Sequence, residues 1–143
     1  MIQWDKQYEI GIDVIDEQHK KLIEITSQLS ELLENAQDGE DIYDDMVRII
    51  NEIAEYTIYH FRYEELLFEK YNYEFKESHI IEHNKLIHEI QSLDLEAIDE
   101  DQITYGKKLL KFLISWIFSH IMGSDFLYKD TLCPENNLAA SSL

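Results

Sequence analysis

Residues 78–89 read SHIIEHNKLIHE and contain three of the six histidines in the chain. His79 and His83 are four residues apart, and His88 follows five residues later. Residues four apart in an α-helix lie about 40° apart around the axis, whereas residues five apart are separated by about 140°. We therefore expect His79 and His83 to share the inner face of a helix, and His88 to lie on the surface.

Amphipathic patterns extend from this stretch in both directions. Glycine (4) and proline (1) are scarce, which disfavours a protein of many strands and turns. Apolar residues at three-to-four spacing predict helices at about 17–36, 42–70, 76–95 and 102–122, the last extending up to a turn further. Asp16 is the expected N-cap of the first helix. Because short connectors make successive long helices antiparallel, we predict an all-α, up-down-up-down antiparallel four-helix bundle.

The 143 residues are expected to form one domain, residues 1–130, with an irregular N-terminal arm and a short C-terminal tail at 131–143. A net charge of −18 disfavours binding to nucleic acid or to anionic lipid. No apolar segment approaches the ~20 residues that span a bilayer, and no signal peptide is evident. The single cysteine, Cys133, fits a reducing cytoplasm. We expect a cytoplasmic protein without nucleic-acid or membrane partners; its oligomeric state is not determined by the sequence, and a monomer is the expectation.

Every predicted helix carries histidine on its apolar stripe, and two helices add a carboxylate. These residues are His19, then His60 and Glu64, then His79 and His83, and finally His120 followed by Asp125. In antiparallel helices all of these positions fall at one end of the bundle. The five-residue separation of His120 from Asp125 does not suit an ideal helix, so we expect a local bulge near Gly123 to turn Asp125 inward.

One histidine on an apolar stripe is usually an ordinary hydrogen-bonded core residue. Five histidines and two carboxylates at one level are different, because burying them without strong partners costs several kcal/mol each. A metal removes that cost, and imidazole suits zinc, copper, iron and nickel. Seven ligands exceed the four of a tetrahedral zinc, so they suit two metals with carboxylate bridges.

Four motifs in this order resemble those of the hemerythrins: DEQHKKL (16–22), HFRYEE (60–65), HIIEH (79–83) and HIMGSD (120–125). The N-terminal pattern W…GIDVIDEQH is similar to the bacterial branch, the bacteriohemerythrins, and the resemblance covers about residues 4–125. It implies a non-haem di-iron centre that binds O2 reversibly.

The resemblance also implies a role for each matching residue. His79, His83 and His120 would hold one iron, and His19 and His60 would hold the other. Glu64 and Asp125 would bridge the two irons, together with an oxo or hydroxo group. O2 would bind to the iron that has only two histidines.

A dry pocket is needed because water or protons would release the bound oxygen. The candidates for its apolar wall are Leu22, Ile23, Phe61, Trp116 and Met122. Met122 departs from the resemblance, since the family usually has leucine or isoleucine at this position.

Three functions remain open at this stage. The first is O2 binding for storage, delivery or sensing, without enzymatic activity. The second is a di-iron enzyme that reduces peroxide or nitric oxide, or oxidises ferrous iron. No further carboxylate lies on the inner stripes to relay protons, which disfavours this enzyme. The third is a metal-free helical interaction domain.

Overall fold

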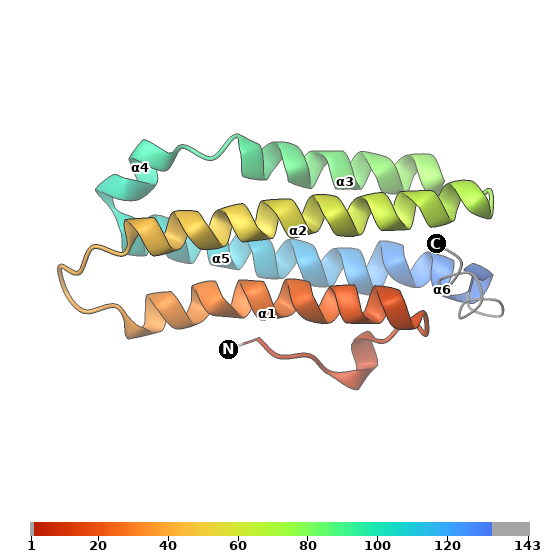
Figure 1. Ribbon diagram of the computed structural model, residues 1–143, viewed down its shortest axis with the longest axis horizontal. Coiled ribbons are helices and arrows are strands. Elements are labelled where there is room, and N and C mark those ends of the chain that lie inside the picture. Colours follow the sequence, from red (N-terminus) through yellow and green to blue (C-terminus); the bar gives the residue numbers. More distant parts are fainter. Residues whose placement is uncertain (1, 133–143) are drawn as a thin grey trace.

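The computed structural model describes residues 2–132, and within this range the chain forms helices and no strand. The long helices are α1 (Asp13–Asn35), α2 (Tyr43–Lys70), α3 (Lys76–Gln91) and α5 (Gln102–Ser119). The short elements are the 3-10 helix η1 (Lys6–Tyr8), α4 (Leu95–Glu100), the π-helix η2 (His120–Asp125) and α6 (Phe126–Leu132). The long helices lie side by side along the long axis of the molecule (Figure 1), so the predicted all-helical bundle is confirmed at this level.

The start of α1 differs from the prediction. The helix begins at Asp13, and Ile12 occupies the N-cap without a side-chain hydrogen bond. Asp16 is therefore inside the first turn rather than at the cap. Its carboxylate accepts hydrogen bonds from the backbone N–H of Ile10 at 2.8 Å and of Gly11 at 3.2 Å. Asp16 thus attaches the N-terminal arm to the helix, a contact that local capping rules do not anticipate.

The connector after α3 also differs. The helix ends at Gln91 rather than near residue 95, and the segment expected as a loop contains α4. Asp94 caps α4 by accepting a hydrogen bond from the N–H of Ala97 at 3.1 Å, and Asp101 caps α5 in the same way through Thr104. These two caps favour the start of α4 and of α5 at these positions.

The fourth long helix continues further than predicted, through η2 and α6 to Leu132. Thr131 and Leu132 are therefore helical, and the rest of the tail expected at 131–143 lies outside the described residues. No helix among residues 2–132 is both long and apolar enough to cross a membrane.

Two apolar clusters divide the interior along the bundle axis. The larger cluster includes Leu29, Ile53, Leu86 and Leu113, one from each long helix. The other lies beneath the N-terminal arm and α6 and contains Ile10, Ile12, Ile15, Leu67, Phe68, Tyr73, Tyr128 and Leu132. On α1, His19 falls between Ile15 and Ile25, which belong to different clusters. The same holds on α2, where Glu64 falls between Phe61 and Leu67. The polar residues of the inner stripes therefore occupy a layer closed by apolar side chains on both sides.

Candidate metal centre

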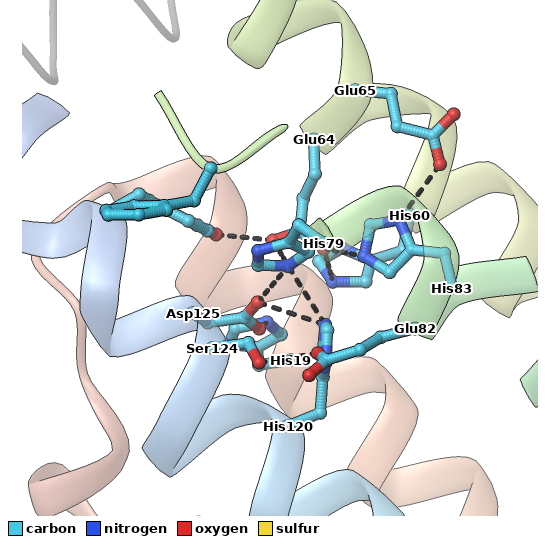
Figure 2. A network of polar contacts seen from close by, with 12 residues as sticks. His19, His60, Glu64, Glu65, His79, Glu82, His83, His120, Ser124 and Asp125 are labelled. Atoms are coloured by element: carbon cyan, nitrogen blue, oxygen red, sulfur yellow. Dashed lines mark hydrogen bonds and ion pairs between the residues drawn. The ribbon is translucent and has the colours of Figure 1, made fainter. Parts of the chain in front are cut away.

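The seven ligand candidates from the sequence converge in this buried layer (Figure 2). They come from α1 (His19), α2 (His60, Glu64), α3 (His79, His83) and η2 (His120, Asp125). Their side chains are between 0% and 5% exposed. His88 is exposed, as predicted from its helix phase.

The ligand atoms form two groups that share one residue. The three-histidine group consists of Glu64, His79, His83 and His120, and the two-histidine group consists of His19, His60, Glu64 and Asp125. Within each group, one donor atom from every residue lies within 4.8 Å of the others. Each group is therefore compact enough to surround a single metal ion.

Both carboxylates reach imidazoles of both groups. Glu64 Oε1 lies 2.9 Å from His60 Nε2 and 3.3 Å from His83 Nε2. Asp125 Oδ2 lies 2.9 Å from His19 Nε2, while its Oδ1 lies 2.8 Å from His79 Nε2. The same Oδ1 is 3.1 Å from His120 Nε2. This central position is the one that a bridging carboxylate requires.

The π-helix η2 explains how Asp125 reaches the centre. In a π-helix the hydrogen bonds join residues five apart, so residues with this separation align on one face. His120 and Asp125 are the first and last residues of η2. The bulge predicted near Gly123 is thus present, and it removes the ~140° rotation that an α-helix would impose.

Several buried polar atoms in the cluster make no hydrogen bond of suitable angle among the described residues, although some lie close to one another. They are both ring nitrogens of His19, Nε2 of His60 and of His83, Oε1 of Glu64 and both oxygens of Asp125. In addition, His79 Nε2 and His120 Nε2 face each other at 3.1 Å. Apart from His19 Nδ1, these atoms point to the interior of the two groups, where metal ions satisfy imidazole nitrogens and carboxylate oxygens. The residues therefore fit a metal site, and the mixed nitrogen and oxygen donors fit iron.

The charges of the cluster follow from its contacts. Burial raises the pKa of Glu64 and of Asp125, but the surrounding histidines outweigh burial and hold both pKa values below the ordinary range. Burial lowers the pKa of His120, yet Asp125 and other carboxylates raise it to about 9. These contacts favour the anionic form of both carboxylates and the protonated form of His120. A metal ion bound by His120 would compete with that proton, because metal binds the neutral imidazole.

Four residues outside the predicted set contact ligand side chains on the side away from the metal position, and a fifth, Ser124, contacts one of these four. None of the five was predicted from the sequence. Gln18 Oε1 lies 2.6 Å from His60 Nδ1, Glu65 Oε2 lies 2.9 Å from His83 Nδ1, and Glu82 Oε2 lies 2.9 Å from His120 Nδ1. Ser124 donates to Glu82, and Tyr128 donates to Glu64 Oε2. Gln18, Glu65 and Glu82 each adjoin a ligand in sequence, but they contact ligands on other helices, so adjacency alone did not identify their partners.

Four of the five residues expected in the apolar wall are at least partly buried, while their role at a pocket stays a prediction. Leu22, Ile23 and Phe61 are buried, and Trp116 is half-buried. The Phe61 ring stacks on His83 with centroids 3.7 Å apart, and Trp116 stacks on His120 at 4.5 Å.

Met122 is a correction. Its side chain is 41% exposed, while the adjacent Ile121 is buried and packs with Ile23 and Ile117. Met122 follows His120 by two residues within η2, which is close to half a turn, so its side chain points away from the face of His120. Met122 is therefore no part of the buried wall, and Ile121 occupies the interior beside it.

Comparisons with known proteins agree with this geometry. A sequence model described as the hemerythrin HHE cation binding domain matches residues 10–132. A bacteriohemerythrin of Clostridium acetobutylicum is 38% identical over 91% of this chain and all of its own length. A bacteriohemerythrin of Pseudomonas paraeruginosa is 33% identical over 90% of this chain and 80% of its own. A hemerythrin-like protein of Naegleria gruberi is 29% identical over 90% and 92%.

Proposed function

Because this chain belongs to the hemerythrin family of HHE cation-binding domains, we propose that it binds O2 reversibly at a pair of iron ions. The observation that supports this most directly is the pair of overlapping ligand groups that share Glu64. Two compact groups with one carboxylate in common suit two adjacent metal ions, whereas a single ion would leave several buried ligands unsatisfied.

In this proposal His79, His83 and His120 would hold one iron, and His19 and His60 would hold the other. Glu64 and Asp125 would be ligands shared by both irons. The contacts of Glu64 and Asp125 with imidazoles of both groups support the bridging role. The two-histidine group has one histidine fewer, so its iron would have the position open to O2.

When bound, the two ferrous ions supply the two electrons that O2 takes up. The contribution of the chain is to hold the ions apart from solvent. Ile23, Phe61 and Ile121 are buried, and the apolar clusters close the layer along the bundle axis. A water-excluded site of this kind limits the loss of bound oxygen.

The same proposal takes the long helices as an up-down-up-down antiparallel bundle and residues 1–130 as its functional unit. The net charge of −18 supports a protein that does not bind nucleic acid. We also propose that the protein is cytoplasmic and monomeric and has no membrane partners.

An anaerobic titration tests the proposed function. Protein loaded with ferrous iron receives O2 in small additions while visible absorption is recorded. We expect saturation at one O2 per two irons and recovery of the initial spectrum when O2 is removed by argon. Continued consumption of peroxide or nitric oxide by the reduced protein, without recovery of the oxygenated spectrum, would instead establish the enzymatic alternative.

A further inference from the structure

The two ligand groups differ in what lies behind their imidazoles, at the nitrogen that faces away from the metal position. In the three-histidine group, the Nδ1 atoms of His83 and His120 each lie 2.9 Å from a glutamate oxygen. In the two-histidine group, His60 Nδ1 lies 2.6 Å from the neutral amide oxygen of Gln18. His19 Nδ1 is buried and has no hydrogen-bond partner among the described residues. Anionic partners thus lie behind two of the three imidazoles of the three-histidine group. In the two-histidine group, one imidazole has a neutral partner and the other has none among the described residues.

Asp16 is a further carboxylate that interacts electrostatically with His19. Its two oxygens accept hydrogen bonds from the backbone of Ile10 and Gly11, and it forms none with the imidazole. Asp16 therefore cannot orient His19 in the way that Glu65 orients His83.

A carboxylate behind a ligating imidazole fixes its ring orientation and makes the metal-binding nitrogen more basic. Hydrogen bonds with a charged partner are also roughly twice as strong as those between neutral groups. Glu65 and Glu82 are 31% and 45% exposed, so solvent weakens their long-range charge but leaves both hydrogen bonds in place. From these contacts we propose that Glu65 and Glu82 are positioning residues that make the three-histidine group the tighter of the two metal positions.

Packing supports the same asymmetry independently of charge. Phe61 lies parallel to the His83 ring, with an interplanar angle of 5°, and Trp116 stacks on His120 at 18°. Ser124 also donates to Glu82, which holds that carboxylate against His120. The rings of His83 and His120 are therefore each fixed by a glutamate at Nδ1 and by an aromatic ring stacked on one face. The iron in the two-histidine group is accordingly the one that leaves first.

This inference rests on the proposed pair of irons, and iron release tests it without reference to O2. Protein loaded anaerobically with ferrous iron is mixed with excess of a ferrous chelator, and absorption of the chelate records release over time. We expect two phases of one iron each, with the slow phase at least about 10-fold slower.

Three substitutions test which ligand group releases its iron in the slow phase and which in the fast phase. Glu65→Gln and Glu82→Gln should each accelerate the slow phase by about 10–100-fold and leave the fast phase unchanged, which is the usual effect of removing such a partner. Gln18→Glu places a carboxylate behind His60 and should slow the fast phase, a gain that a merely structural role would not produce. Glu77→Gln is the matched control, since Glu77 is exposed on the same helix as Glu82 and lies outside both groups.

The outcomes separate the two proposals. Release of both irons in a single phase by the unaltered protein would overturn the inference but not the proposed pair of irons. A slow phase whose rate is unchanged in both glutamate variants would do the same. Equal acceleration of both phases, with a matching fall in melting temperature, would show a structural role and also overturn it. Fewer than two irons bound by the unaltered protein would overturn the proposed function together with the inference.

Discussion

Glu64 and Asp125 are the residues on which both ligand groups depend. Each is fully buried and contacts imidazoles from both groups. Glu64 has one further partner, the hydroxyl of Tyr128, which is itself fully buried. Burial, followed by the neighbouring Glu64 and Asp125, raises the pKa of Tyr128 well above its ordinary value, so the hydroxyl keeps its proton and remains a donor.

Tyr128→Phe should therefore destabilise the metal-free protein. The substitution leaves a buried carboxylate oxygen without its donor, at an expected cost of about 1–3 kcal/mol in the free energy of unfolding. Urea denaturation followed by circular dichroism measures this loss. Tyr73→Phe is the matched control, because the buried Tyr73 hydroxyl has no hydrogen-bond partner among the described residues. Equal losses in the two variants would contradict the assigned role of Tyr128.

His83 and His88 provide a second test at the residue scale. His83 is fully buried in the three-histidine group, whereas His88 is exposed on the same helix. His83→Ala should lower iron content from two per chain towards one, since it removes a ligand and the stacking partner of Phe61. His88→Ala should retain both irons. Metal analysis of the two purified variants measures their iron content. Loss of iron in His88→Ala would contradict the placement of His88 on the outer face of α3.

At the scale of elements, η2 is the feature that completes the metal centre. Its π geometry aligns His120 with Asp125 and also directs Ser124 towards Glu82. Gly123 within η2 has open space around it, because a Cβ added there would meet no atom within 4 Å. The glycine is thus not needed for close packing, and the spacing between His120 and Asp125 is the essential quantity.

Insertion of one alanine after Gly123 should remove Asp125 from the centre. The added residue rotates the following segment by about 100°, and packing of Tyr128 in its apolar cluster opposes any compensating rotation. We expect the iron content to fall below two per chain while the helix content by circular dichroism is unchanged. Gly123→Ala should retain both irons and serves as the control. An insertion variant that keeps two irons would show that the spacing in η2 is not critical.

At the scale of the whole molecule, the metal centre is a polar layer enclosed by two apolar clusters. Seven buried ionisable side chains interrupt what would otherwise be a continuous core. Several of their polar atoms are buried without a hydrogen bond among the described residues, which is costly in an interior of low dielectric constant. Metal binding is therefore coupled to the stability of the bundle.

Removal of iron should accordingly lower the melting temperature. A ligand present at 100 times its dissociation constant stabilises the folded state by about 2.7 kcal/mol. Thermal unfolding followed by circular dichroism, with and without a chelator, measures the shift. The difference in melting temperature between iron-loaded and chelator-treated protein should be smaller in His83→Ala and unchanged in His88→Ala. An unchanged melting temperature on chelation would argue against iron bound in the interior.

Much of the fold and of the ligand set was accessible from the sequence. The 3.6-residue period places apolar residues and histidines on shared helix faces, and this local regularity is independent of the remaining chain. For the same reason the exposure of His88 and the need for a bulge between His120 and Asp125 were predicted correctly. The wrong prediction for Met122 followed the position of a family residue rather than the helix phase, which by itself points the side chain outward.

Contacts between helices were decided only by the tertiary structure. The partners of Glu65 and Glu82 lie 18 and 38 residues away in sequence, and their distances depend on how the helices rotate and slide against one another. Asp16 likewise binds the backbone of the N-terminal arm, whereas its residue type and position had predicted an N-cap. The sequence by itself thus determined which side chains face the interior, because helix periodicity is local. Only the packed bundle decided which carboxylate supports which imidazole, because that pairing depends on distances between segments remote in the chain.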